Sequence, residues 1–114
     1  MFVYKVFPSE EGWPFPKYHG ACGRIIVTED CGKSLNHFLY HPWIVRAQLA
    51  VNLLRIAQQL TVNKQNWALY MLDVSLNNFA VSDNGIVKLV DVEHLIVVDL
   101  ETVSSKLLVD VNAF

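Results

Sequence analysis

The longest regular pattern of apolar and polar positions covers residues 42–60. Apolar residues recur there at intervals of three and four, which places their side chains along one face of an α-helix. Pro42 suits the first turn, because its missing N–H would have no partner there. We therefore expect one continuous helix over residues 42–60 that buries its apolar face. That face consists of Ala50, Leu53, Leu54, Ala57 and Leu60.

Shorter apolar runs on both sides of this helix have the length and the β-branched or aromatic content of strands. They predict strands over residues 23–30, 67–72 and 95–100. Residues 34–40 favour a short helix with Ser34 as its N-cap. The segment 9–20 is rich in proline, glycine and aromatic residues, so we expect it to be irregular.

Two apolar runs, residues 79–81 and 86–90, flank the sequence Ser-Asp-Asn-Gly. Asn-Gly accepts the positive φ angles of a type I′ turn, so we expect the two runs to form an antiparallel hairpin. A hairpin brings the start of its first strand beside the end of its second. Asn78 and Asp91 should therefore lie close together, with Asp73 one loop away.

Asp73, Asn78 and Asp91 are polar positions in a strongly apolar stretch. For any one of them a role in a turn is the better explanation, because Asp and Asn favour turns. Their joint spacing and the order of the strands between them favour a metal site instead. Two oxygen ligands with a third carboxylate nearby suit Mg²⁺, which binds few protein oxygens and completes its shell with water and substrate phosphates.

Composition limits the class of protein. The chain has 114 residues, of which 53% are hydrophobic and 18% charged, as in a globular domain or part of one. The net charge of −2 and the lack of a basic cluster give little support for nucleic-acid binding. We expect no membrane span and no signal peptide in this chain, because no apolar run has the required length or flanks. Cys22 and Cys31 form no C-x-x-C pair, and we expect one or two buried thiols rather than a disulfide.

The stretch from Asp73 to Asp91 resembles a known family. Its D-x-x-x-x-N motif, the hairpin and the sequence VKLVD, preceded by a long helix, are similar to the catalytic-loop half of a protein kinase. More narrowly, FPSEEGWPFPKYHGACGR and ALYMLDVSLNNFAV resemble the deleted-in-autism branch of the divergent protein kinase domain family, whose members are kinase-like proteins of the secretory pathway. The resemblance covers about residues 7–99. It implies an α+β fold in which residues 1–114 form part of a kinase-like domain: the end of the small lobe, the hinge and the upper large lobe.

The resemblance also implies roles for individual residues. Asp73 would be the catalytic base that accepts the proton of the substrate hydroxyl. Asn78 and Asp91 would bind Mg²⁺ or Mn²⁺ together with ATP. The backbone of a short segment at the end of a strand would face the adenine ring. This segment consists of Thr28, Glu29, Asp30 and Cys31.

The chain departs from the kinase pattern beside these residues. Met71 and Leu72 stand where kinases have His and Arg, and Ser75 replaces a Lys near the transferred phosphate. Glu93 stands in place of the Gly of the metal-binding motif. The sequence also contains no Gly-rich phosphate loop and no strand lysine of the kinase type, so we expect the chain alone to be inactive.

Two functions from different classes stay open. The protein that contains this chain would transfer phosphate from a nucleotide to a protein in the secretory pathway, either in the Golgi lumen or after secretion. Alternatively, it would be a pseudokinase, a non-catalytic luminal or secreted module that binds a protein receptor. Asp73, Asn78 and Asp91 favour the enzyme, whereas the departures favour the binding module.

Overall fold

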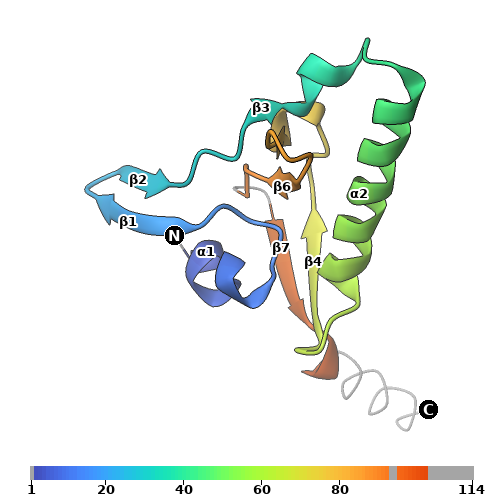
Figure 1. The fold of residues 1–114 in the computed structure, drawn as a ribbon. Coiled ribbons are helices and arrows are strands. Elements are labelled where there is room, and N and C mark those ends of the chain that lie inside the picture. Colours follow the sequence, from blue (N-terminus) through green and yellow to red (C-terminus); the bar gives the residue numbers. More distant parts are fainter. Residues whose placement is uncertain (1, 93–94, 103–114) are drawn as a thin grey trace, which may run out of the picture.

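The computed structural model describes residues 2–92 and 95–102, and Figure 1 shows how they are arranged. They form a mixed α+β fold in which a long helix, α2, stands beside short antiparallel strands. The helices are α1 (Phe2–Val6) and α2 (Trp43–Thr61), with 3₁₀ turns η1 (Ser9–Glu11), η2 (Leu35–Phe38) and η3 (Leu76–Asn78). The strands are β1 (Tyr18–Cys22), β2 (Ile25–Thr28), β3 (Lys33–Ser34), β4 (Trp67–Met71), β5 (Phe79–Val81), β6 (Val87–Leu89) and β7 (Leu95–Asp99).

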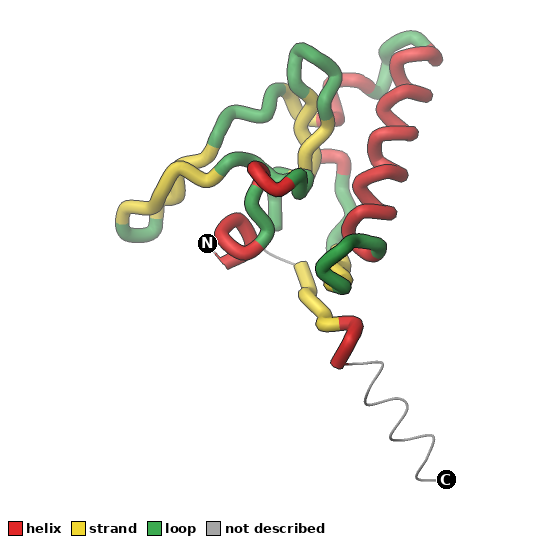
Figure 2. Tube along the Cα trace, turned by 60° about the horizontal axis from the view of Figure 1, so that its bottom comes forward, coloured by secondary structure: helices red, strands yellow, loops and turns green. Residues whose placement is uncertain are grey.

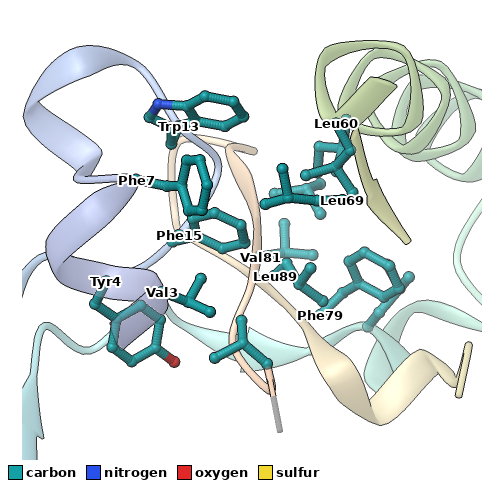
Figure 3. Packing of buried hydrophobic residues seen from close by; sticks show 14 of the residues in the cluster. Val3, Tyr4, Phe7, Trp13, Phe15, Leu60, Leu69, Phe79, Val81 and Leu89 are labelled. Atoms are coloured by element: carbon teal, nitrogen blue, oxygen red, sulfur yellow. The ribbon is translucent and has the colours of Figure 1, made fainter. Parts of the chain in front are cut away.

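One hydrophobic core lies between α1, α2 and the β5–β6 hairpin. In Figure 3 the rings of Phe7, Trp13 and Phe15 lie on one side of Leu89 in the hairpin, and Leu69 of β4 lies on the other. The ring centroids of Phe7 and Trp13 are 4.8 Å apart in an edge-on arrangement, which favours aromatic pairs. The aromatic segment that the sequence predicts to be irregular therefore contributes large side chains to the core.

The helix expected over residues 42–60 is confirmed, because α2 is continuous and has Pro42 as its N-cap. The expected buried face is confirmed for Leu60 but wrong for Ala50, Leu54 and Ala57. The core-facing side chains of α2 are Leu49, Ile56 and Leu60, with Leu53 half-buried. The exposed ones include Leu54, at 70% of its surface, together with Ala50 and Ala57. Both sets have helical spacing, so the periodicity alone could not decide which apolar face packs inward.

Among the described residues, every helix falls short of the length and hydropathy that a membrane span requires.

The expected hairpin is confirmed. β5 pairs antiparallel with β6, with Phe79 opposite Leu89 and Val81 opposite Val87. The type I′ turn is wrong, because Gly85 has a φ of +78° but Asn84 has no positive φ. The N–H of Gly85 instead donates to the Ser82 carbonyl oxygen at 2.9 Å, which closes a three-residue loop ending in a left-handed glycine.

β4 and β7 form a second antiparallel ribbon, and they confirm the two strands expected there. Trp67 lies opposite Asp99 and Met71 opposite Leu95. Asn63 connects the end of α2 to this ribbon, because its Nδ2 donates to the carbonyl oxygens of Gln59 at 3.0 Å and Trp67 at 2.7 Å. Its Oδ1 also accepts the backbone N–H of Trp67 at 3.1 Å. One side chain thus fixes where β4 starts relative to the helix.

β1 and β2 form the β1–β2 arm, which extends away from the core in Figures 1 and 2. β2 confirms the strand expected over residues 23–30, whereas β1 overlaps a segment expected to be irregular. The pairing is interrupted between Tyr18 and Gly20, and such a glycine obscures a strand in the sequence. Both cysteines are free thiols, but only Cys31 is buried. The expectation of one or two buried thiols is met by Cys31 alone, because Cys22 lies on the arm.

The chain enters the core from the arm at Gly32. Its φ is +105°, and a Cβ at this position would lie 2.0 Å from the carbonyl oxygen of Val81. This close approach lets β3 pair with β5, with Lys33 opposite Val81. Ser34 then caps η2, since its Oγ accepts the N–H of Asn36 at 3.3 Å. The expected N-cap is confirmed, although the turn that follows is a 3₁₀ helix.

Replacing Gly32 by Ala should destabilise the protein far more than replacing Gly23 by Ala. Gly23 also has a positive φ, +59°, but a Cβ added there would meet no atom within 4 Å. We expect a loss of about 1–2 kcal/mol at Gly23 and of roughly 3 kcal/mol or more at Gly32, where the backbone must move. Urea denaturation measures both values, and equal losses would contradict the close approach of Gly32 to β5.

Replacing Ile56 by Asp should be much more disruptive than replacing Leu54 by Asp. Ile56 is buried, so the new carboxylate would lose water without a partner, at a cost of roughly 3 kcal/mol or more. Leu54 is exposed, and a charge there should change stability by about 0.5 kcal/mol. Thermal denaturation of both variants tests the orientation of α2. A larger effect at Leu54 would show that the other face is buried.

Candidate metal and catalytic site

Three loops at the ends of the two ribbons carry the predicted polar residues. Asp73 follows the end of β4, Asn78 precedes β5, and Asp91 lies between β6 and β7. Because antiparallel pairing places the end of one strand beside the start of the next, these loops converge. Asp73, Asn78 and Asp91 line one small hollow together with Met71 and Leu95. The structure therefore brings together the three residues that the sequence singled out.

The hollow has room for an ion rather than for an organic molecule. Its volume is about 10 Å³, close to that of a single water site. Asp73 and Asp91 are exposed and Asn78 is half-buried, so solvent reaches the oxygen atoms that could bind a cation. Among the described residues no group of three or more His, Cys, Asp or Glu side chains could hold a metal. The two carboxylates and one amide of the hollow are oxygen donors that could hold a cation which keeps several waters, as Mg²⁺ does.

Asn78 is held by hydrogen bonds on both sides of the hollow. Its Nδ2 donates to the carbonyl oxygen of Asp73 at 2.9 Å. The backbone carbonyl oxygen of Asn78 accepts the N–H of Val90 at 2.8 Å, and Val90 directly precedes Asp91. The amide nitrogen is thus occupied by the Asp73 loop, which leaves the Asn78 Oδ1 as the atom of this side chain able to bind a cation.

The loop between Asp73 and Asn78 is shaped by its own small side chains. Ser75 caps η3, because its Oγ accepts the N–H of Asn77 at 3.3 Å. The side chain of Asn77 in turn accepts a hydrogen bond from the Nδ2 of Asn36 in η2. These contacts connect the loop, which follows α2 in the sequence, to η2, which precedes it. They hold the loop against η2.

Tyr4 is a site residue that the sequence did not reveal. Its hydroxyl donates to the carbonyl oxygen of Val90 at 3.0 Å, so α1 supports the strand end beside Asp91. Burial, and then the negative charge of Asp91, raises the pKa of the Tyr4 phenol to about 12. The phenol therefore stays a neutral hydrogen-bond donor at physiological pH. In the sequence, Tyr4 is an aromatic residue within an apolar stretch, and such a residue carries no functional signal.

The segment Thr28, Glu29, Asp30 and Cys31 does not line the hollow with the other three predicted residues. It lies where the β1–β2 arm joins the core, and the N–H of Glu29 donates to the Lys17 carbonyl oxygen at 2.9 Å. The Glu29 carboxylate is paired with Lys88. Burial raises the pKa of the Cys31 thiol to about 11. The side chains of Glu29 and Cys31 are thus engaged with the protein itself.

The sequence of the chain matches a family model described as the protein-kinase domain of FAM69, over residues 1–108. The chain belongs to this family. It is 49% identical over 98 residues to divergent protein kinase domain 2A of Homo sapiens and of Xenopus tropicalis, a match that covers 85% of this chain and 23% of each relative. It is 34% identical over 97 residues to divergent protein kinase domain 2B of Homo sapiens, covering 85% and 22%. No solved structure matches the chain.

These matches confirm the resemblance to divergent protein kinase domains, and they agree with a partial kinase-like α+β fold. The chain spans less than a quarter of the length of these curated relatives. Within the family fold, the departures from the kinase pattern have visible places. Met71 lines the hollow, Leu72 is 68% exposed, and Ser75 is used as a cap. Glu93 lies outside the described residues.

Replacing Asn78 by Asp should destabilise this kinase-like domain by about 1–2 kcal/mol near neutral pH. The change keeps the size of the side chain but turns its donor toward Asp73 into an acceptor, so two oxygens would face each other. Below about pH 4 the introduced carboxyl is protonated and can donate again, so its deficit relative to the wild type should shrink.

Urea denaturation at both pH values measures this effect, and Asn84→Asp in the exposed hairpin loop is the matched control. The control should show neither the loss nor the recovery. An Asn78→Asp variant as stable as this control near neutral pH would argue against the hydrogen bond to Asp73.

Proposed function

We propose that the protein containing this chain binds a nucleotide through Mg²⁺ or Mn²⁺ and transfers its terminal phosphate to a hydroxyl group of a protein. The observation that carries this proposal is the convergence of Asp73, Asn78 and Asp91 on one ion-sized hollow. Phosphoryl transfer requires mainly positioning and charge neutralisation, which such a set of oxygens and a divalent cation supply. ATP is the expected nucleotide, by family resemblance.

Asp91 is the main metal ligand in this proposal, and Asn78 is the secondary one. A carboxylate attracts a divalent cation through a full charge, whereas the amide oxygen of Asn78 offers only a dipole. The bound metal would neutralise the phosphate oxygens of the nucleotide. Val92, the residue after Asp91, is buried, so the chain is fixed immediately beyond the ligand.

Asp73 is the catalytic base in this proposal. Its carboxylate is exposed, so a hydroxyl group of a protein can reach it. Its backbone carbonyl is fixed by Asn78, which couples the base to the proposed metal ligand. The segment Thr28–Cys31 would contribute backbone groups to adenine, and the engagement of Glu29 and Cys31 side chains with the protein supports a backbone role.

A specific set of observations favours a second function, a pseudokinase that binds a protein receptor. Met71 and Leu72 provide no cation beside Asp73, and the Ser75 hydroxyl is used to cap η3. Leu72 and Val74 are exposed apolar side chains on the same loop, at 68% and 73% of their surfaces. Such side chains suit contact with a partner better than contact with phosphate. Under either function we propose a location in the secretory pathway, by family resemblance.

Three substitutions in the full-length protein separate these functions. Asp91→Asn should weaken Mn²⁺–ATP binding by about 10- to 100-fold, and Asn78→Ala by less, because only the first removes a charge at the metal. Asp73→Asn should leave binding nearly unchanged and abolish transfer, because a base positions the acceptor rather than the nucleotide. Thermal shift with and without metal measures binding, and transfer of labelled phosphate measures catalysis.

The wild-type protein gives the reference for both assays, and Asp83→Asn in the exposed hairpin loop controls for the loss of one carboxylate. Binding of Mn²⁺–ATP without transfer would favour the pseudokinase. If the wild-type protein binds no nucleotide with either metal, the enzyme function fails and the receptor-binding function takes its place.

A further inference from the structure

Four segments of the chain meet at the Glu29–Lys88 pair. Its Oε1 accepts the backbone N–H of Lys17 at 2.9 Å and pairs with the Nζ of Lys88 on β6. The same Nζ lies 3.5 Å from the Oγ of Ser9 in η1. The side chains of Lys88 and Glu29 are only 22% and 33% exposed, so solvent screens this pair less than a fully exposed one.

The Glu29–Lys88 pair lies where the β1–β2 arm joins the core. The β1–β2 arm extends from the core, and Glu29 lies where the arm ends. Ala80 on β5 lies opposite Lys88 in the register of the hairpin. The hydrogen bond from Lys88 lowers the pKa of the Glu29 carboxyl, so the pair stays charged at neutral pH.

The segment Thr28–Cys31 is therefore attached to the β5–β6 hairpin at both of its ends. Near the start of the segment, Glu29 forms an ion pair with Lys88 of β6. Directly after the end of the segment, Gly32 packs on Val81 and β3 pairs with β5. Asn78 and Asp91 lie at the open end of this same hairpin. The β5–β6 hairpin thus positions both proposed parts of the nucleotide site: the Thr28–Cys31 segment for adenine, and Asn78 and Asp91 for the metal and phosphates.

We propose that Glu29 and Lys88 are positioning residues, which hold the Thr28–Cys31 segment at the distance from Asp91 that lets one metal–nucleotide contact both. This inference rests on the proposed function and adds the element that couples its two halves. A ligand that binds two sites at once gains affinity only when their separation is fixed correctly. Loosening the pair should reduce that gain while leaving each end able to bind its own part of the ligand.

The test uses the full-length protein and three probes: Mn²⁺ alone, adenosine alone, and Mn²⁺–ATP. Glu29→Gln and Lys88→Met should each weaken Mn²⁺–ATP binding about fivefold or more, the usual size of a coupling between two sites. For Lys88→Met, which lies outside the proposed binding residues, binding of Mn²⁺ or of adenosine alone should stay within about twofold of the wild type. The exchanged pair, Glu29→Lys with Lys88→Glu, should recover much of the loss. Glu10→Gln, on an exposed glutamate of η1, is the matched control.

Hydrogen exchange provides a readout that is independent of ligands. In both single variants the amides of β1 and β2 should exchange faster, while those of β4 and β7 should not change. Equal weakening of all three probes, or faster exchange throughout the protein, would overturn the positioning role in favour of general structural support. Unchanged Mn²⁺–ATP binding would overturn it as well.

A wild-type protein that binds none of the three probes would remove the proposed function. The exchange measurement would then decide the positioning of the arm by itself. Unchanged exchange in β1 and β2 would show that the Glu29–Lys88 pair does not hold the segment.

Discussion

The pairing of β5 with β6 is the interaction on which the rest of the structure depends. Its inward side chains, among them Val81 and Leu89, fill the centre of the core. One edge accepts β3, and the N–H of Leu89 donates to the carbonyl oxygen of Pro14 at 2.8 Å, so both flanking segments are attached to it. Because the hairpin is short, its register also decides where Asn78 and Asp91 lie. A shift by one residue would reverse every side chain and separate the two.

The elements with strong local signals could be predicted from the sequence. A long periodic run and an Asn-Gly turn between apolar runs are local features, and they identified α2 and the hairpin. The convergence of Asp73, Asn78 and Asp91 followed from the same hairpin, because antiparallel strands return the chain to its starting point. The type of turn did not follow, since Gly85 alone accepts the positive φ and the loop has one residue more than a type I′ turn requires.

Features that depend on contacts between distant segments could not be predicted. The face of α2 is one example, because Leu54 and Ile56 are equally apolar and only the position of β4 and β6 decides between them. Tyr4 contacts Val90 across 86 positions of the chain, and Glu29 contacts Lys88 across 59. Neither contact leaves a spacing that a sequence can show. Both lie next to the candidate site, so the sequence identified the groups with chemistry and missed those that support them.

The two cysteines occupy opposite environments, which makes the molecule selective toward reagents that modify sulfur. Cys31 is buried and its thiol is protonated across the neutral range, so alkylating agents reach it only slowly. Cys22 is exposed near the tip of the β1–β2 arm. A maleimide dye or spin label added to the unmodified protein will therefore attach on the arm. Within these 114 residues, one exposed thiol thus serves as a spectroscopic handle on the orientation of the arm relative to the core.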